Sequence, residues 1–301
     1  MNEANSIAMQ IRTPFPYIGG KNRLSAEIKK YLPAPKKHRA HIEPFAGGLS
    51  VLFAVEPAQA YVNDAFSHLY HYWLAMIEYP EQFQAEYAKV INHERLLDYY
   101  FKRSVDDVLP EQERIVASAI YFYLKIHNSW SGKWTGTDDF RFVYSIRNSH
   151  KIKEDFNDWV EFFKKMSITV WNLDFREFFE KMLNIRTISE MYWYVDPPYY
   201  SSQMEEYYQH SKSLGFGPAE HNELFEFLCR VDEQDQLWVL SYNSCPEVEE
   251  LYGSFNIRPI SYNRSSTSAA INDINETTEF LISNKPFSVR NSRRSLNDWL
   301  I

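Results

Sequence analysis

The stretch from Tyr192 to Tyr200, YWYVDPPYY, places a carboxylate where it could act on an amino group. Its aromatic and β-branched residues predict a buried strand, which stops at Asp196 because proline has no amide hydrogen for a strand ladder. An amino group on an aromatic ring is a poor nucleophile, since its lone pair is delocalised into the ring. The Asp196 carboxylate and the Pro197 carbonyl, on a turn stiffened by Pro198, could accept its two hydrogens and free that pair. Tyr199 offers a stacking face, although the motif alone also fits a stiff turn with a surface tyrosine.

A glycine turn and an acidic residue indicate that the protein binds a second ligand in addition to the one that carries the amino group. The sequence EPFAGG places Gly47 and Gly48 between an expected strand and helix, where a missing Cβ permits close approach. It does not match the dinucleotide fingerprint GxGxxG, because Leu49 follows. Asp64 ends the next expected strand, where its carboxylate could accept from both hydroxyls of a ribose or cap the following helix. Together these residues suggest an adenosine-bearing ligand without a pyrophosphate.

Two weaker signals could serve the same ligand. Gly19, Gly20 and Lys21 follow an aromatic residue and would bring free amides and one flexible cation to a concave site, but such strings are common in loops. Asp174 and Phe175 offer an acceptor and a π-face for an adenine. The same pair at the start of a helix is equally typical of an N-cap followed by a core phenylalanine.

The elements that carry these residues alternate between strand and helix. A strand around Ile42 and a helix precede the short strand AYVND and an aromatic helix from about Ser67 to Tyr79. Residues 80–125 have helical spacing, and residues 127–150, rich in Gly, Ser, Trp and basic residues, predict a loop with an irregular strand. The alternation then resumes and ends in FNIRPISYN and ETTEFLISN. We expect an α/β protein with a mostly parallel sheet, helices on both faces and an inserted helical domain.

Composition narrows the class of protein. A chain of 301 residues with 45% hydrophobic content can build a large core. Its two cysteines lack CxxC spacing, and it has neither a signal pattern nor a run of about 18 apolar residues, so we expect a soluble cytoplasmic protein. His68 and His71 lack further ligands at metal spacing, so no metal site is expected.

The charge distribution qualifies the net charge of −8. An acidic total argues against a nucleic-acid partner, because Lys and Arg supply most non-specific affinity for phosphates. However, residues 1–41 carry eight Lys and Arg against two Glu, and residues 125–153 carry six against two Asp. The second segment also contains Trp130 and Trp134, a composition suited to contacting both bases and phosphates.

Taken in order, YIGGK, EPFAGG, YVND, LDF and DPPY resemble the Dam-type (D12 class) adenine-specific DNA methyltransferases over nearly the whole chain. NSWSG is similar to the element that opens the inserted domain of that family, and WVLSYNSCPEVEELY and ETTEFLISN resemble its late strand motifs. The resemblance implies a Rossmann-like class I methyltransferase sheet, with residues 1–79 and 165–301 as the catalytic domain and residues 80–164 as an inserted, mainly helical target-recognition domain. It also implies S-adenosylmethionine as cofactor and double-stranded DNA as partner, with the target adenine flipped out of the duplex.

Site residues follow from the same resemblance. The catalytic set comprises Asp196, Pro197, Pro198 and Tyr199. The cofactor set comprises Tyr17, Gly19, Gly20, Lys21, Phe45, Gly47, Gly48, Asp64, Asp174, Phe175 and Asp196. The insert is expected to hold DNA through Lys125, Asn128, Trp130, Lys133, Arg141 and Arg147. The turn reads FAGGLS where many members have FxGxG, so Leu49 replaces a glycine.

Two other functions stay open on the sequence alone. One is an RNA base methyltransferase, because DPPY also occurs in RNA guanine methyltransferases. The other is a sequence-specific DNA-binding protein that has kept the fold and lost turnover. Within the preferred function, Asp196 is expected to act as acceptor and electrostatic stabiliser rather than as general base, because the ordinary pKa of aspartate is low. The target sequence, the oligomeric state and any membership of a restriction-modification system or a phage stay undetermined.

Overall fold

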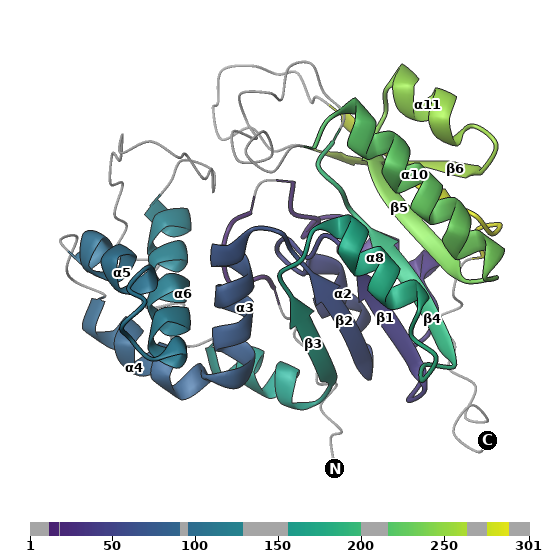
Figure 1. Ribbon diagram of the computed structural model, residues 1–301. Coiled ribbons are helices and arrows are strands. Elements are labelled where there is room, and N and C mark those ends of the chain that lie inside the picture. Colours follow the sequence, from purple (N-terminus) through teal and green to yellow (C-terminus); the bar gives the residue numbers. More distant parts are fainter. Residues whose placement is uncertain are drawn as a thin grey trace, which may run out of the picture.

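A computed structural model of the chain describes residues 12–17, 19–90, 96–128, 156–199, 216–263 and 276–288. They form a seven-stranded sheet with the order β3-β2-β1-β4-β5-β7-β6 (Figure 1). The first five strands of this order pair in parallel, and β7 pairs antiparallel with both β5 and β6. The strands are β1 (Arg39–Glu43), β2 (Gln59–Asn63), β3 (Ser167–Trp171), β4 (Glu190–Val195), β5 (Leu237–Asn243), β6 (Asn256–Asn263) and β7 (Glu276–Ser283). The expected Rossmann-like, mostly parallel sheet is confirmed.

The register of the parallel strands brings their carboxyl ends to one edge of the sheet. Ile42 of β1 pairs with Tyr61 of β2 and with Trp193 of β4. Val195, the last residue of β4, pairs with Leu240 of β5. Residues that directly follow these strands therefore meet in space although they are far apart in the sequence.

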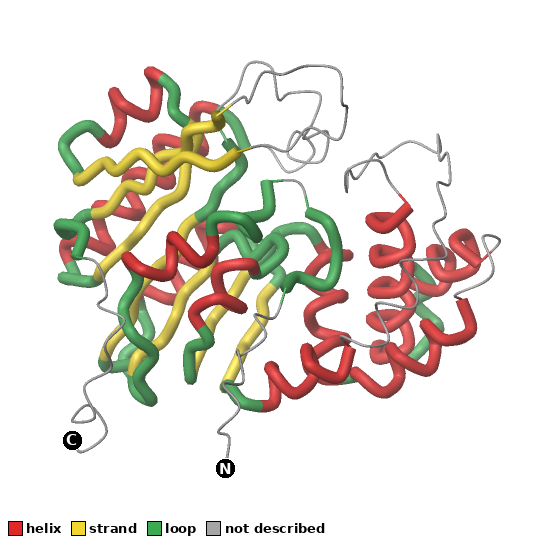
Figure 2. Tube along the Cα trace, turned by 180° about the vertical axis from the view of Figure 1, so that it is seen from behind, coloured by secondary structure: helices red, strands yellow, loops and turns green. Residues whose placement is uncertain are grey.

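Helices cover both faces of the sheet. In β4, Trp193 and Val195 pack toward α8 (Phe175–Leu183) and α10 (Pro218–Glu233), whereas Tyr192 and Tyr194 pack toward α1 (Ser25–Ile28) and α2 (Ser50–Val55). This alternation follows from the period of two in a strand. Figure 1 shows α8 and α10 across one face, and Figure 2 shows shorter helices on the opposite face. The helices of both faces are α1 (Ser25–Ile28), the 3₁₀ turn η1 (Lys29–Tyr31), α2 (Ser50–Val55), α3 (Ser67–Glu78), α8 (Phe175–Leu183), α10 (Pro218–Glu233) and α11 (Pro246–Tyr252).

The helices of the predicted insert pack beside α3 (Figure 1). They are α4 (Pro80–Val90), α5 (Leu96–Ser104) and α6 (Glu111–Asn128), and residues 156–164 are also helical. Trp73 of α3 and Phe122 of α6 belong to one hydrophobic cluster that also contains Val62 of the sheet. The described part of the insert therefore shares its core with the rest of the molecule, and the boundaries at residues 80 and 164 stay a prediction.

The loop expected over residues 127–150 is wrong for its first two residues, and residues 129–150 lie outside the described residues. His127 and Asn128 still belong to α6, because Tyr123 and Ile126 continue its buried face to the end of the helix. No helix in the described ranges is long and apolar enough to cross a membrane.

Candidate active site

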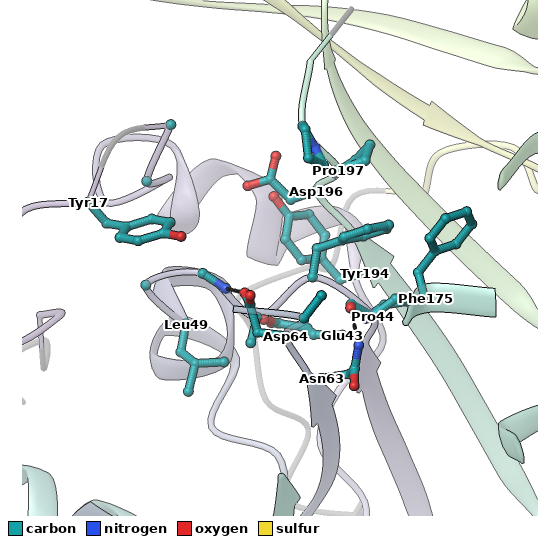
Figure 3. Close-up of a pocket in the computed structure, with 18 of the residues that line it drawn as sticks. Tyr17, Glu43, Pro44, Leu49, Asn63, Asp64, Phe175, Tyr194, Asp196 and Pro197 are labelled. Carbon is teal, nitrogen blue, oxygen red and sulfur yellow. Dashed lines mark hydrogen bonds between the residues drawn. The ribbon is translucent and has the colours of Figure 1, made fainter. Parts of the chain in front are cut away.

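A pocket of about 1090 Å³, counting the space at its mouth, opens beyond the carboxyl ends of the parallel strands (Figure 3). Figure 3 shows Tyr17 facing Phe175 across it, with Asp196 and Asp64 on its other two sides. Every residue predicted for the catalytic and cofactor sets lines this pocket. They are Tyr17, Gly19, Gly20, Lys21, Phe45, Gly47, Gly48, Asp64, Asp174, Phe175, Asp196, Pro197, Pro198 and Tyr199.

The glycine turn between β1 and α2 is held from two sides. The amide of Gly47 donates to Asp64 Oδ2 at 3.0 Å, and Trp73 Nε1 of α3 donates to the Gly47 carbonyl at 2.9 Å. Gly47 has a φ of +46°, and a Cβ at this position would lie 3.3 Å from the Tyr17 ring. A side chain at this position would therefore be strained and would press on the wall of the pocket.

Leu49 adopts a glycine-like conformation at the end of the same turn. Its φ is +53°, in the left-handed region that a branched aliphatic residue rarely enters. Its side chain is buried in the cluster that contains Trp73 and Phe15. The backbone thus keeps the conformation expected at a third glycine, and the buried side chain offsets the strain.

Asp64 has two structural contacts in addition to its place in the pocket. Its Oδ1 accepts from the amide of Phe66 at 2.9 Å, at the start of α3, and its Oδ2 accepts from Gly47. Asp64 therefore holds the turn before α3, but the capping alternative is not observed, because Phe66 is the N-cap residue and has no side-chain cap hydrogen bond. A carboxylate has about four acceptor positions, so both oxygens keep capacity for a ligand. Burial raises the pKa of Asp64 to about 6.

Asn63 joins two turns of the pocket; it stands in the YVND motif but was not among the predicted site residues. Its Nδ2 donates to the carbonyls of Pro44 at 3.1 Å and Leu173 at 3.0 Å, and its Oδ1 accepts from the amide of Leu173 at 2.9 Å. The turn after β1 and the turn after β3 are thus fixed to the end of β2. The only signal in the sequence was a polar residue closing a buried strand.

Three phenylalanines form one wall. The ring of Phe45 lies 5.8 Å from Phe175 and 5.5 Å from Phe216, and Phe175 and Phe216 are 5.4 Å apart. Phe216 was missed because no motif surrounds it. Asp174 is the N-cap of α8, since its Oδ1 accepts from the amide of Arg176 at 2.9 Å. The N-cap alternative for Asp174 is therefore observed.

At the catalytic end, Asp196 is paired with a buried lysine. Lys21 Nζ lies 2.8 Å from Asp196 Oδ1, and the side chains are 3% and 21% exposed. Tyr199 stacks on Tyr242 of β5 with ring centres 5.2 Å apart, and its hydroxyl donates to Glu279 Oε2 at 2.9 Å. Tyr242 stands near the carboxyl end of an expected strand, where ligands bind, but the sequence assigned it no role, and Glu279 was not predicted, because it reaches the site through strand pairing rather than through a local motif.

The electrostatic surroundings correct one expectation about Asp196. Burial raises its pKa to about 6; the charge of Lys21 lowers it in part, and the charges of Glu279 and Glu43 raise it further. The ordinary pKa of aspartate, which argued against a role as general base, is therefore the wrong reference for this carboxyl. The group is ionised at neutral pH yet close enough to its pKa to take up a proton.

The model of the D12 class N6 adenine-specific DNA methyltransferase family matches residues 17–266. The chain belongs to this family. It is also similar to the Type II methyltransferase M1.LlaDCHI of Lactococcus lactis subsp. cremoris, with 27% identity over 294 residues that cover 94% of this chain and 99% of the relative. This D12 class enzyme is thus a DNA adenine methyltransferase, and the alternative of an RNA base methyltransferase is not favoured.

The residues predicted to bind DNA in this methyltransferase are only partly described. Lys125 lies in α6, is 6% exposed, and its Nζ lies 3.4 Å from the hydroxyl of Tyr121. Asn128 is the last residue of the same helix. Trp130, Lys133, Arg141 and Arg147 lie outside the described residues.

His68 and His71 have a structural explanation in the D12 methyltransferase. The Nδ1 atoms of both lie within hydrogen-bond distance of Ser118 Oγ, at 2.7 and 2.9 Å, between α3 and α6. Burial lowers the pKa of His68 to about 4, so it stays neutral at physiological pH. No group of three or more His, Cys, Asp or Glu suited to a metal ion occurs within the described ranges.

Proposed function

We propose that the pocket binds S-adenosylmethionine and that the target adenine, flipped out of duplex DNA, enters beside Asp196. When bound, this cofactor supplies an activated methyl group on a sulfonium. The observation that carries the proposal is the meeting of Asp64, the glycine turn and Asp196 around one pocket. These residues come from the ends of three neighbouring parallel strands, which is where open α/β sheets bind their ligands.

Several features of the pocket fit an adenosine-bearing cofactor. The wall of Phe45, Phe175 and Phe216 suits an adenine ring, and the free acceptor positions of Asp64 suit ribose hydroxyls. Ser50 Oγ is buried, lines the pocket and has no hydrogen-bond partner within the described ranges. A polar ligand would satisfy this hydroxyl, which is otherwise costly to bury.

The catalytic residues are arranged to act on an exocyclic amino group. The Asp196 carboxylate and the Pro197 carbonyl would accept its two hydrogens, which draws the nitrogen toward a tetrahedral shape and frees its lone pair. Tyr199 would provide the stacking face. Because Asp196 has a pKa of about 6, it can also hold the proton that the nitrogen releases after methylation. Rigid placement on the proline turn favours the reacting geometry, and such orientation can lower a barrier by roughly 7–11 kcal/mol.

Replacement of Asp196 by alanine tests these roles. We expect methyl transfer to unmethylated plasmid DNA to fall by at least about a hundredfold, because the lost acceptor acts on the reacting nitrogen. Cofactor affinity, measured by calorimetry, should stay within about tenfold of wild type. The matched control is Asp107→Ala, which removes a carboxylate whose side chain is 94% exposed. Transfer at the wild-type rate in Asp196→Ala would refute the proposal.

The partner and its setting are further parts of the proposal. Duplex DNA would be held by the basic insert from Lys125 to Lys153, in which six Lys and Arg stand against two Asp, although Lys125 itself is buried beside Tyr121. Similarity to a Type II methyltransferase supports a place in a restriction-modification system. Cys229 and Cys245 are free thiols, which supports action in the reducing cytoplasm.

A further inference from the structure

A buried lysine occupies the contacts that the proposed function assigns to the target adenine. The Lys21 ammonium donates to the Gly19 carbonyl at 2.8 Å and lies 2.8 Å from Asp196 Oδ1. The same nitrogen lies 4.7 Å from the centre of the Tyr199 ring. Asp196 and Tyr199 are the acceptor and the stacking face that the base requires. The base therefore competes with Lys21 for the Asp196 carboxylate and for the ring of Tyr199.

Glu279 is a second carboxylate within reach of the same lysine. Its Oε2 lies 3.8 Å from Lys21 Nζ, and the two side chains are 8% and 3% exposed. A buried ammonium needs a charged partner, because an unpaired charge away from water is strongly destabilising. Within the described ranges, the ion pairs of Lys21 are those with Asp196 and Glu279. When Lys21 leaves Asp196, Glu279 is the acid positioned to receive it.

The sheet topology explains why Glu279 lies at this site. In the antiparallel pair of β5 and β7, Glu279 stands opposite Asn243, the last residue of β5. Because β7 runs against the parallel strands, its first half reaches the edge where those strands end. Glu279 also accepts from the hydroxyl of Tyr199, 80 positions earlier in the chain.

We propose that Glu279 is a positioning residue for methyl transfer, which receives the Lys21 ammonium when the adenine takes its place at Asp196. This inference rests on the proposed function, in which Asp196 accepts the hydrogens of the amino group. Glutamine at position 279 keeps an acceptor for the Tyr199 hydroxyl and removes the charge that Lys21 needs. Glu279→Gln therefore separates the two contacts of this side chain.

The first measurement is the kcat and the KM for duplex DNA of Glu279→Gln, with unmethylated plasmid as substrate. We expect kcat to fall roughly ten- to a hundredfold, because Lys21 is held more firmly at Asp196. Cofactor affinity should stay within about threefold, since Glu279 is not among the residues that line the pocket. The control is Glu250→Gln, which makes the same charge change at an exposed position of α11. A wild-type kcat in Glu279→Gln would overturn the proposal.

A double variant shows whether the effect passes through the lysine. Lys21→Met removes the ammonium, so adding Glu279→Gln to it should cause no further loss of kcat. If Glu279→Gln lowers kcat by the same factor with and without the lysine, Glu279 acts through another contact and the proposal is wrong.

The pH profile provides an independent readout. Charged or titratable groups around Asp196 are Lys21 before α1, Glu43 of β1, Tyr194 of β4, Tyr199 and Glu279 of β7. The negative charge of Glu279 raises the pKa of Asp196, so Glu279→Gln should move the acid limb of kcat to lower pH. An acid limb that stays in place would count against the proposal. If Asp196→Ala keeps its rate, the proposed function fails; if Glu279→Gln alone keeps its rate, only this inference fails.

Discussion

The Asp196 carboxyl has a pKa of about 6, because burial penalises its charged form and the ion pair with Lys21 offsets only part of that penalty. In the proposed mechanism the ionised form is the active one, since a protonated carboxyl accepts hydrogen bonds less well. The raised pKa therefore moves the loss of activity upward in pH, from the range near 4 that an ordinary aspartate would give.

The first prediction follows from this value. The kcat/KM for duplex DNA, which reports groups of the free enzyme, should be constant above about pH 7 and should fall as pH drops through about 6, with a tenfold loss per pH unit below that. Saturating cofactor at each pH keeps cofactor binding from contributing. A midpoint near pH 4 would show that the carboxyl behaves as an exposed aspartate.

The conformation of Leu49 leads to a second prediction, about which of two Leu49 variants is the more stable. Both Leu49→Ala and Leu49→Gly lose a buried leucine, and each should lower the free energy of unfolding by about 2–5 kcal/mol. Inside a helix alanine is the more stable of the two. With φ at +53°, we expect the glycine variant to be more stable than the alanine variant by about 1 kcal/mol, as measured by urea unfolding. The reverse order would show that the left-handed conformation is absent in solution.

The predicted site residues share a property that the missed ones lack. Asp196 belongs to the short DPPY motif, in which an acid, two prolines and a tyrosine together indicate an amino-group acceptor. The sequence was therefore enough to predict its place in the pocket. Glu279 reaches the site because β7 pairs with β5, and Tyr242 because β5 pairs with β4, and the motifs of these strands do not show which strands are neighbours. Phe216 joins the aromatic wall from outside any regular element.

Among the elements, β2 has an influence beyond its five residues. Its last residue, Asn63, makes three hydrogen bonds to the turns after β1 and β3. The sequence predicted this strand, its direction and the acid that follows it. The cross-links could not be predicted, because they depend on which strands are neighbours, and the order β3-β2-β1 is not the order along the chain.

Asn63→Ala is the third prediction. It leaves one amide and two carbonyls without their buried partner, so the free energy of unfolding should fall by about 3 kcal/mol. Cofactor affinity should fall as well, because the turns that carry Phe45 and Phe175 lose the hydrogen bonds to Asn63 that hold them together. The control is Asn184→Ala, whose side chain donates to a helix carbonyl at an exposed position and should change stability by less than about 1 kcal/mol. Equal stability losses in the two variants would contradict the role assigned to Asn63.

Across the whole molecule, charged residues are unevenly distributed along the chain, whereas the hydrophobic core is continuous. The net charge of −8 hides a basic segment between residues 125 and 153. The core, in contrast, runs without a break from the sheet through α3 to α6. Sequence composition showed the first feature, because charge can be counted along the chain. It could not show the second, because a shared core depends on packing between distant helices.

The fourth prediction concerns DNA affinity. Alanine at Lys133, Arg141 or Arg147 should weaken binding to every duplex if the residue contacts a phosphate, and should lower the dependence of log affinity on log salt by about one. A residue that contacts a base should instead cost about 1–3 kcal/mol at one position of the target site. Titrations of wild type and the three variants at several salt concentrations measure both quantities. Unchanged affinity and slope in all three would move the interface to the basic residues 1–41.

The place of β7 between β5 and β6 has a consequence during translation. Until Glu276–Ser283 has left the ribosome, β5 has no partner on that side and β6 has no neighbour at all in the described sheet. Unpaired strand edges of this kind attract other chains. Glu279 belongs to β7 and is synthesised after all the residues that line the pocket. A nascent chain that ends before β7 therefore contains Asp196 and the whole pocket but lacks the acid that Lys21 requires. On this view, a growing chain reaches its full rate of DNA methylation only after β7 has emerged.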